Sequence, residues 1–191
     1  MNRKTWLFLS FFATILSLDQ ATKIWIVNNI EYRREEITVI PHFFSLVHAQ
    51  NPGAAFGLFR DMPATARMLI FLGFTIVALF IIIDLWRRLP TDDWFMSITL
   101  GLVMGGAIGN GVDRIAKQSV TDFLLIYTDK PGLREWLIGT FGTNEWPSFN
   151  VADSALVVGM CLFVIHYLFL EDNDEEEAPV LTKPTDESDL S

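Results

Sequence analysis

The chain has 191 residues, of which 51% are hydrophobic and 13% aromatic, and its formal net charge is −9. Such a composition argues against an ordinary water-soluble domain. Residues 171–191 contain nine acidic residues and one lysine, a net charge of −8, so nearly all of the charge belongs to a tail that we expect to be disordered. No basic patch is interleaved with aromatic residues, so nucleic acid is not an expected partner.

Four apolar runs are long enough to cross a membrane as helices. With their ends they cover about residues 5–27, 66–86, 94–112 and 152–170. A hydrocarbon core about 30 Å thick needs roughly 20 helical residues, so each run suffices. The first run could instead be a cleaved signal peptide, but no well-formed small-x-small cleavage site follows its apolar core. We therefore expect four transmembrane helices.

The distribution of basic residues indicates the orientation of these spans. An even number of spans places both termini on one side of the membrane. Arg3 and Lys4 precede the first span and Arg87 and Arg88 follow the second, which favours the cytoplasm for that side. The two long loops, about residues 28–65 and 113–151, would then face outward, although they also contain several basic residues.

Two further patterns bear on the fold. The stretch EEITVIPHFFSLVHAQ in the first long loop is rich in β-branched and aromatic residues and ends at the turn signal NPG. It predicts a short sheet on the membrane surface. In the third span, Gly101, Gly105 and Gly109 recur every four residues and predict close packing of helix backbones.

Polar residues gather at one end of the predicted bundle, where they indicate function because ionisable groups at membrane depth are costly. Structural roles compete with this interpretation: Asp153 could cap its helix, Asp19 could pair with Lys23, and Asp113 with Arg114 could form an ion pair that locks the fold. The residues at this end are Asp19, Asn51, Asn110, Asp113, Arg114, Asp122, Asn150 and Asp153.

Two of these carboxylates suggest a reaction. If Asp122 and Asp153 converge, they share one proton, so one can activate a water molecule while the other protonates a peptide carbonyl. Cysteine chemistry is disfavoured because Cys161, the sole cysteine, lies inside a span, and no serine occupies a nucleophile elbow. The three histidines share no spacing, so no metal is expected. A small transporter that binds ions or protons, and a noncatalytic assembly factor, remain as alternatives.

Five motifs together resemble the lipoprotein signal peptidase family, also called signal peptidase II. In chain order they are SLDQATK, NPGAAFGLF, GGAIGNGVDRI, VTDFL and FNVADSAL. The resemblance implies a bacterial inner-membrane aspartic endopeptidase that cuts a prolipoprotein before a cysteine carrying diacylglycerol. It implies no cofactor, and we expect a monomer whose partners are these precursors and membrane lipids.

The resemblance also assigns residues. It implies that Asp122 and Asp153 are the catalytic pair. Residues that bind substrate or support the site would be Asp19, Asn51, Gly106, Asn110, Asp113, Arg114, Asn150 and Ala152.

The expected fold is an all-α membrane protein with four transmembrane helices, a small extracytoplasmic β-cradle and an interfacial amphipathic segment. Residues 1–170 would form the peptidase domain, followed by the cytoplasmic tail at 171–191. The connection between Asp122 and Asp153 is longer than is usual in the family. Within it, LREWLIGTFG predicts an interfacial helix or a lid.

Overall fold

The computed structural model describes residues 2–53 and 62–169 of a mostly helical protein. The acidic tail and residues 54–61 of the NPGAAFGLF motif lie outside the described residues. The elements, in chain order, are α1 (Arg3–Asn29), β1 (Glu36–Ile40), β2 (Phe44–Asn51), α2 (Ala64–Arg88), α3 (Trp94–Lys117), β3 (Val120–Ile126), α4 (Leu133–Phe141) and α5 (Val151–Phe169).

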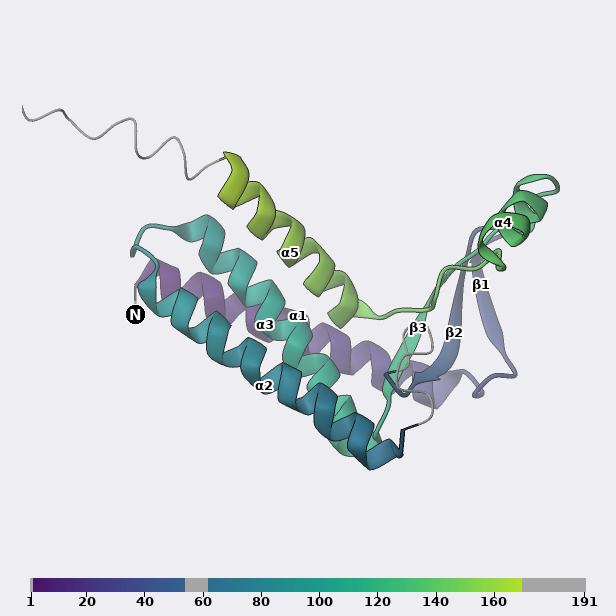
Figure 1. Ribbon diagram of the computed structural model, residues 1–191, viewed down its shortest axis with the longest axis horizontal. Coiled ribbons are helices and arrows are strands. Elements are labelled where there is room, and N and C mark those ends of the chain that lie inside the picture. The colour runs from purple at the N-terminus through teal and green to yellow at the C-terminus, as the bar shows by residue number, and fades with distance from the viewer. Residues whose placement is uncertain (1, 54–61, 170–191) are drawn as a thin grey trace, which may run out of the picture.

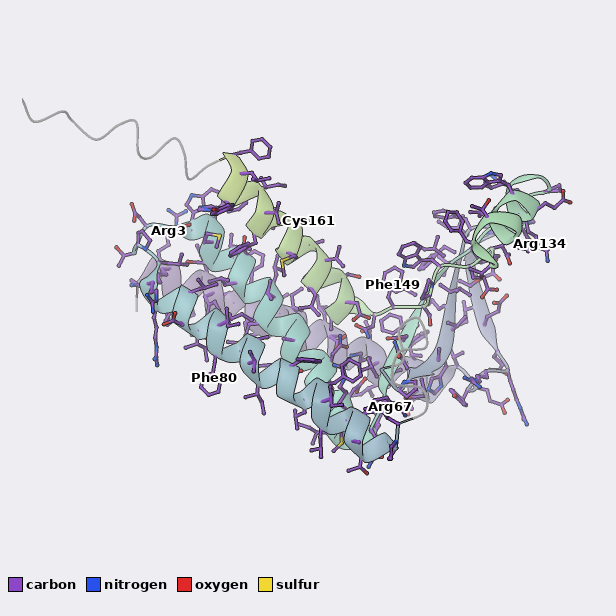
Figure 2. All side chains as sticks on the ribbon, viewed as in Figure 1. Arg3, Arg67, Phe80, Arg134, Phe149 and Cys161 are labelled. Carbon is purple, nitrogen blue, oxygen red and sulfur yellow. The ribbon has the colours of Figure 1, made fainter. Side chains whose placement is uncertain are left out.

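Helices α1, α2, α3 and α5 are each long and apolar enough to cross a membrane, so the prediction of four spans is confirmed. Helix α3 is central and packs against the other three (Figure 1). In its most apolar window 72% of the residues are buried, against 17% or less in the other spans. The outer helices expose large apolar side chains such as Phe80, which projects away from the bundle (Figure 2). Such a surface suits lipid rather than water.

Glycines bring α1 and α3 close together. A Cβ added at Gly101 would lie 2.7 Å from the Phe8 carbonyl oxygen, and one at Gly105 would lie 2.7 Å from Ile15 Cβ. Any side chain at these positions would push the two helices apart. The glycine stripe therefore packs helices, as predicted.

Both described ends of the chain lie at the same end of the bundle. Lys4 Nζ donates to the Leu89 carbonyl oxygen at 2.6 Å, which joins the start of α1 to the α2–α3 connection. His166 Nε2 near the end of α5 lies 3.8 Å from a carboxylate oxygen of Asp93 in the same connection. The sheet lies at the opposite end of the bundle (Figure 1).

The sheet has three antiparallel strands in the order β1-β2-β3. The pair β1–β2 was predicted from the sequence, whereas β3 was not, although it carries Asp122. In the β2–β3 register Ala49 lies opposite Asp122. Buried Phe123 of β3 packs with Ile26 and Ile30 from the end of α1, which fixes the sheet against the helical bundle.

The chain also returns along the other edge of β3 before it enters α5. The Trp146 amide donates to the Ile126 carbonyl at 2.8 Å, and the Phe149 amide donates to the Leu124 carbonyl at 3.1 Å. These bonds hold the segment 144–149, here called the return segment, beside β3. The start of α5 is thereby brought next to Asp122.

Candidate active site

Asp122 and Asp153 come from different elements that meet at the sheet end of the bundle. Asp122 lies on β3 and is 2% exposed. Asp153 lies in the first turn of α5 and is half-buried. The charge on Asp153 acts directly on Asp122, so the two carboxyl groups are electrostatic neighbours.

Asn150 connects the two carboxyl groups. Its side-chain Nδ2 donates to Asp122 Oδ1 at 2.7 Å, and its backbone amide donates to Asp153 Oδ2 at 3.1 Å. The Asp153 amide in turn donates to Asn150 Oδ1 at 2.9 Å. This reciprocal pattern is that of a capping box, in which Asn150 is the N-cap residue of α5 and Asp153, three residues later, is its partner. Capping and a position beside Asp122 are therefore compatible, because the same bonds that begin α5 orient the carboxylate.

Two further asparagines flank the pair. Asn110 on α3 donates from Nδ2 to Asp153 Oδ1 at 2.7 Å. Asn51, the last residue of β2, hydrogen-bonds to the Asp122 carboxyl and accepts a bond from the Gly53 amide at 2.9 Å. Each carboxyl group is thus held by Asn150 and by one other asparagine, and all three asparagines were among the predicted site residues.

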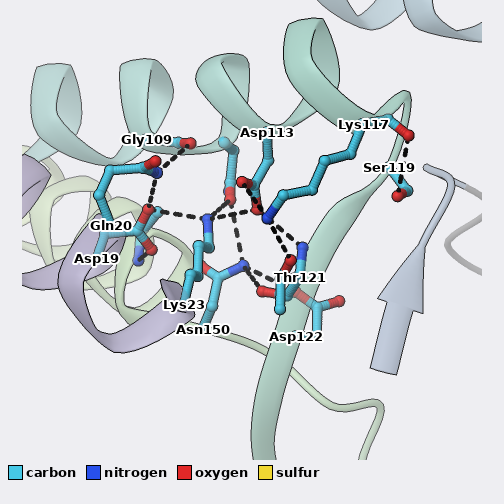
Figure 3. Close-up of polar contacts among 12 residues, drawn as sticks. Asp19, Gln20, Lys23, Gly109, Asp113, Lys117, Ser119, Thr121, Asp122 and Asn150 are labelled. Carbon is cyan, nitrogen blue, oxygen red and sulfur yellow. Dashed lines mark hydrogen bonds and ion pairs between the residues drawn. The ribbon is translucent and has the colours of Figure 1, made fainter. Parts of the chain in front are cut away.

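A buried cation, Lys23, lies between Asp19 and Asp113 (Figure 3). Lys23 of α1 is 1% exposed, and its Nζ lies 2.8 Å from Asp19 Oδ2 and 3.4 Å from Asp113 Oδ2. It also donates to Asn110 Oδ1 at 3.0 Å. The predicted pairing of Asp19 with Lys23 is present, but the lysine does more, because it also orients the amide that donates to Asp153.

Burial perturbs the titration of Asp122. It raises the pKa of Asp122 from 3.8 to about 7, and the negative charge of Asp153 raises it in the same direction. Hydrogen bonds from Asn51 and Asn150 and the positive charge of Lys23 oppose the rise. Near neutral pH the carboxyl group of Asp122 therefore holds a proton much of the time.

Close packing of α3 against α5 explains the structural roles of Gly106 and Ala152. A Cβ at Gly106 would lie 2.5 Å from the Ala152 carbonyl oxygen, so only glycine allows this approach. The Ala152 amide donates to Asp19 Oδ1 at 3.0 Å, which ties α1 to the first turn of α5. Asp19 is completely buried and is itself approached by Gly109. These three predicted residues position the helix that carries Asp153.

Asp113 and Arg114 do not form the ion pair that the sequence suggested. Asp113 pairs with Lys23 and with Lys117, whose Nζ lies 3.2 Å from Asp113 Oδ1. Arg114 instead places its guanidinium over the ring of Phe71, 5.0 Å from the centroid. Consecutive helical residues project about 100° apart, so neighbours in sequence point in different directions whereas residues four apart share a face. Arg114 still feels the charges of Asp122 and Asp153, which keeps it near the site.

Thr121 and Lys117 were not predicted. The Thr121 amide donates to Asp113 Oδ2 at 2.9 Å, and Lys117 Nζ donates to Thr121 Oγ1 at 3.1 Å. These bonds fix the residue next to Asp122 (Figure 3). The i,i+4 spacing of Asp113 and Lys117 was the available signal for this contact.

The three histidines lie apart from one another and from the carboxylate pair. His42 contacts Asp129, His48 contacts the Ile30 carbonyl, and His166 contacts Asp93. Within residues 2–53 and 62–169, no group of three or more His, Cys, Asp or Glu side chains could hold a metal ion.

A cavity of about 560 Å³ lies over the sheet, between the residues that precede β1 and the return segment. Its lining includes Arg33, Glu36, Ala49 and Trp146. The described lining residues do not include Asp122 or Asp153, so the cavity is adjacent to the carboxylates rather than around them.

Four membrane helices that hold two carboxyl groups together against a small sheet are the arrangement of a membrane-embedded peptidase of the aspartic type. Comparisons with known proteins specify the family. The family model described as Signal peptidase (SPase) II matches residues 11–169. The chain therefore belongs to the signal peptidase II family, the lipoprotein signal peptidases, which remove signal peptides from prolipoproteins.

Individual relatives agree with this assignment. The chain is 36% identical over 170 residues to the lipoprotein signal peptidase of Desulforapulum autotrophicum, covering 88% of this chain and 96% of that protein. It is 40% identical over 152 residues to that of Maridesulfovibrio salexigens, covering 80% and 88%. A bacterial membrane enzyme solved by the in meso method at 1.9 Å superposes with a TM-score of 0.68 at 28% identity, covering 85% of this chain and 92% of that one.

Proposed function

We propose that Asp122 and Asp153 are the catalytic pair of this signal peptidase II, and that it cleaves its precursor immediately before a diacylglyceryl-modified cysteine. The observation that carries the proposal is Asn150, which donates to Asp122 from its side chain and to Asp153 from its backbone. One residue thus sets the relative position of both carboxyl groups. Such preorganisation is what a two-carboxylate mechanism requires.

In the proposed mechanism the two carboxyl groups have different protonation states. Burial raises the pKa of Asp122 to about 7, so Asp122 carries the shared proton. Asp153 accepts hydrogen bonds at both oxygens, from Asn110 and from the Asn150 amide, as suits an ionised carboxylate. Asp122 is therefore the acid and Asp153 the base.

The reaction then proceeds by direct attack of water. Asp153 takes a proton from the water as its oxygen bonds to the scissile carbonyl carbon, and Asp122 gives its proton to the carbonyl oxygen. When the tetrahedral intermediate collapses, the C–N bond breaks. The proton on Asp153 passes to the leaving amine of the modified cysteine, and the gem-diol returns a proton to Asp122. Asn51 and Asn150 orient the carboxyl groups throughout.

The remaining predicted residues support this site. Asp19, Gly106 and Ala152 hold the first turn of α5 against α1 and α3. Asp113 anchors Thr121 beside Asp122. Arg114 lies close enough to both catalytic carboxylates to feel their charge, and we assign it a contact with substrate.

We further propose that both termini lie in the cytoplasm and that the active site faces the outside of the bacterial inner membrane. Arg3 and Lys4 lie at one end of the bundle with Arg87 and Arg88, whereas the sheet and the carboxylates lie at the other. Basic residues beside span ends favour the cytoplasmic side. Residues 1–170 act as one monomeric peptidase domain in this proposal, followed by the acidic cytoplasmic tail.

The test is cleavage of a precursor by purified variants in detergent. Asp122→Asn and Asp153→Asn should each abolish cleavage of the diacylglyceryl-modified precursor, and the wild-type enzyme should leave the unmodified precursor intact. Asp84→Asn is the matched control, because Asp84 pairs only with exposed Arg88 among the described contacts and lies at the far end of the bundle. Substantial turnover by either catalytic variant, at normal expression and with a normal melting profile, would remove the assignment.

A further inference from the structure

Helix α4 (Leu133–Phe141) lies in the long connection between the two proposed catalytic residues and has no part in the site described above. It stands at the tip of the sheet, away from the helical bundle (Figure 1). None of its residues is buried. An apolar helix is thus exposed on the surface of the protein.

The ends of α4 are set by glycine. Gly132 precedes the helix with φ +82°, and Gly142 ends it with φ +77° while its amide donates to the Ile138 carbonyl at 2.9 Å. Side-chain-bearing residues rarely adopt this left-handed region. The nine-residue helix is therefore a defined element, begun and ended by its own sequence.

The base of the excursion is fixed to the sheet. The Thr128 amide donates to the Asn144 carbonyl at 3.1 Å, and Asn144 Nδ2 donates back to the Thr128 carbonyl at 2.8 Å. Next to this closure, His42 Nδ1 lies 2.6 Å from Asp129 Oδ1 and joins the β1–β2 turn to the loop before α4. Because these hydrogen bonds hold both ends of the excursion to the sheet, they favour a fixed position for α4 over a flap that swings across the active site.

The surface of α4 is strongly apolar. Leu133, Trp136, Leu137 and Phe141 recur at helical spacing and share one face. Trp136 is 58% exposed and Phe141 67%, and their rings meet edge to face at 5.9 Å. Trp146, at the start of the return path from α4, is also 67% exposed. Exposed aromatic rings at this density are typical of the membrane–water interface.

The position of α4 fits a lipid surface. The sheet extends sideways from the end of the bundle, so α4 lies beside the bundle axis rather than beyond its end (Figure 1). If the four spans cross the bilayer, α4 lies near its surface. Figure 2 shows Arg134 on the side of α4 that is turned away from α5. Arg134 and Glu135 cancel in charge, so attraction to anionic lipid is not the driving force.

We propose that α4 is an interfacial anchor whose apolar face inserts among the phospholipids of the leaflet on the sheet side of the membrane. Its partner is lipid, bound through apolar area rather than charge. The anchor continues into the return segment, which is hydrogen-bonded to β3 and leads to Asn150. Lipid contact at α4 thereby helps to hold the sheet, and with it Asp122, at a constant depth. Only the naming of this leaflet as the outer one rests on the orientation proposed above.

The depth of α4 can be measured on the full chain in liposomes. Cys161, the sole cysteine, is replaced by Ser, and Leu133→Cys, Phe141→Cys and Glu135→Cys are each labelled with an environment-sensitive fluorophore. In neutral phosphatidylcholine, labels at 133 and 141 should emit at shorter wavelength, be quenched by shallow spin-labelled lipid and resist aqueous iodide. The label at 135 should show the reverse. Adding phosphatidylglycerol should change none of these results.

Several outcomes would overturn the anchor. Equal iodide quenching at all three positions would place α4 in water. Protection that appears only at high protein-to-lipid ratio would indicate a second copy of the chain, and protection only with a precursor peptide would indicate a substrate lid. Protection only with phosphatidylglycerol would indicate electrostatic binding. Because the readout needs no turnover, the same pattern in an Asp122→Asn background separates this proposal from the catalytic one.

Discussion

Two ion pairs in this protein have the same spacing and the same length but differ in burial, and their energies should differ accordingly. Asp19 and Lys23 are four residues apart on α1, 2.8 Å apart, and at most 1% exposed. Asp84 and Arg88 are four residues apart on α2 and also 2.8 Å apart, but both are more than half exposed. The surface pair is thus a matched control for the buried one.

The expected magnitudes follow from the environments. Two unit charges 2.8 Å apart attract by about 1.5 kcal/mol in water and by about 6 kcal/mol at an effective dielectric constant near 20. Exposed pairs contribute less than about 1 kcal/mol after entropy and screening, whereas removing one partner of a buried pair costs roughly 3–5 kcal/mol. Lys23→Met should therefore destabilise the protein by several kcal/mol, because it leaves Asp19 uncompensated and removes a donor from Asn110.

The assay is a double-mutant cycle on the free energy of unfolding, measured by titration with denaturing detergent in mixed micelles. Asp19→Asn combined with Lys23→Met should lose less than the sum of the single variants, with a coupling energy of at least about 2 kcal/mol. The cycle of Asp84→Asn and Arg88→Met should give a coupling below about 0.5 kcal/mol. Equal coupling energies in the two cycles would refute the claim that burial makes the Lys23 network strong.

Two other stability measurements test the packing and the electrostatics of the site. Gly106→Ala should lower the free energy of unfolding by about 1–3 kcal/mol, because its Cβ would lie 2.5 Å from the Ala152 carbonyl oxygen. Gly73→Ala is the control and should not destabilise the protein, because the space around Gly73 is open. Equal effects of the two substitutions would contradict the close approach of α3 to α5. Because burial raises the pKa of Asp122 from 3.8 to about 7, the folded state binds the extra proton between these values, so wild-type stability should fall as pH rises through that window and stay level above it. Between melts at pH 5 and pH 8 the wild type should lose about 3 kcal/mol, from the roughly two pH units between pH 5 and the pKa of about 7 at about 1.4 kcal/mol each, and Asp122→Asn should not show this loss. Identical pH slopes would show that Asp122 is not the group responsible.

The four spans could be predicted from the sequence because each depends on a local property. A run of apolar residues long enough to cross the bilayer satisfies its own backbone hydrogen bonds as a helix, so its identity does not depend on distant partners. The β1–β2 pair was predictable for a similar reason, since both strands and their turn lie within one short stretch. Strand β3 differs, because VTDFLLI becomes a strand through pairing with β2, which precedes it by two membrane helices.

The residues of the candidate site also divide into those that local sequence motifs predict and those whose contacts depend on distant parts of the chain. The motifs identified Asp122, Asp153 and the asparagines, but the bonds from Asn150 to both carboxyl groups are seen only in three dimensions. Lys23 was explained by its neighbour Asp19, four residues away, which concealed its contact with Asn110 from α3. The position of Lys23 within a predicted span was the available signal, because a buried charge needs several partners.

The central claim is that Asp122 and Asp153 hydrolyse the precursor while sharing one proton, and the pH dependence of kcat/KM for a diacylglyceryl-modified peptide in detergent tests it most directly. Because burial sets the pKa of Asp122 near 7, the shared proton is lost above that pH, and kcat/KM should fall about tenfold for each further pH unit. A rate that stays level or rises between pH 7 and pH 9 would contradict the account.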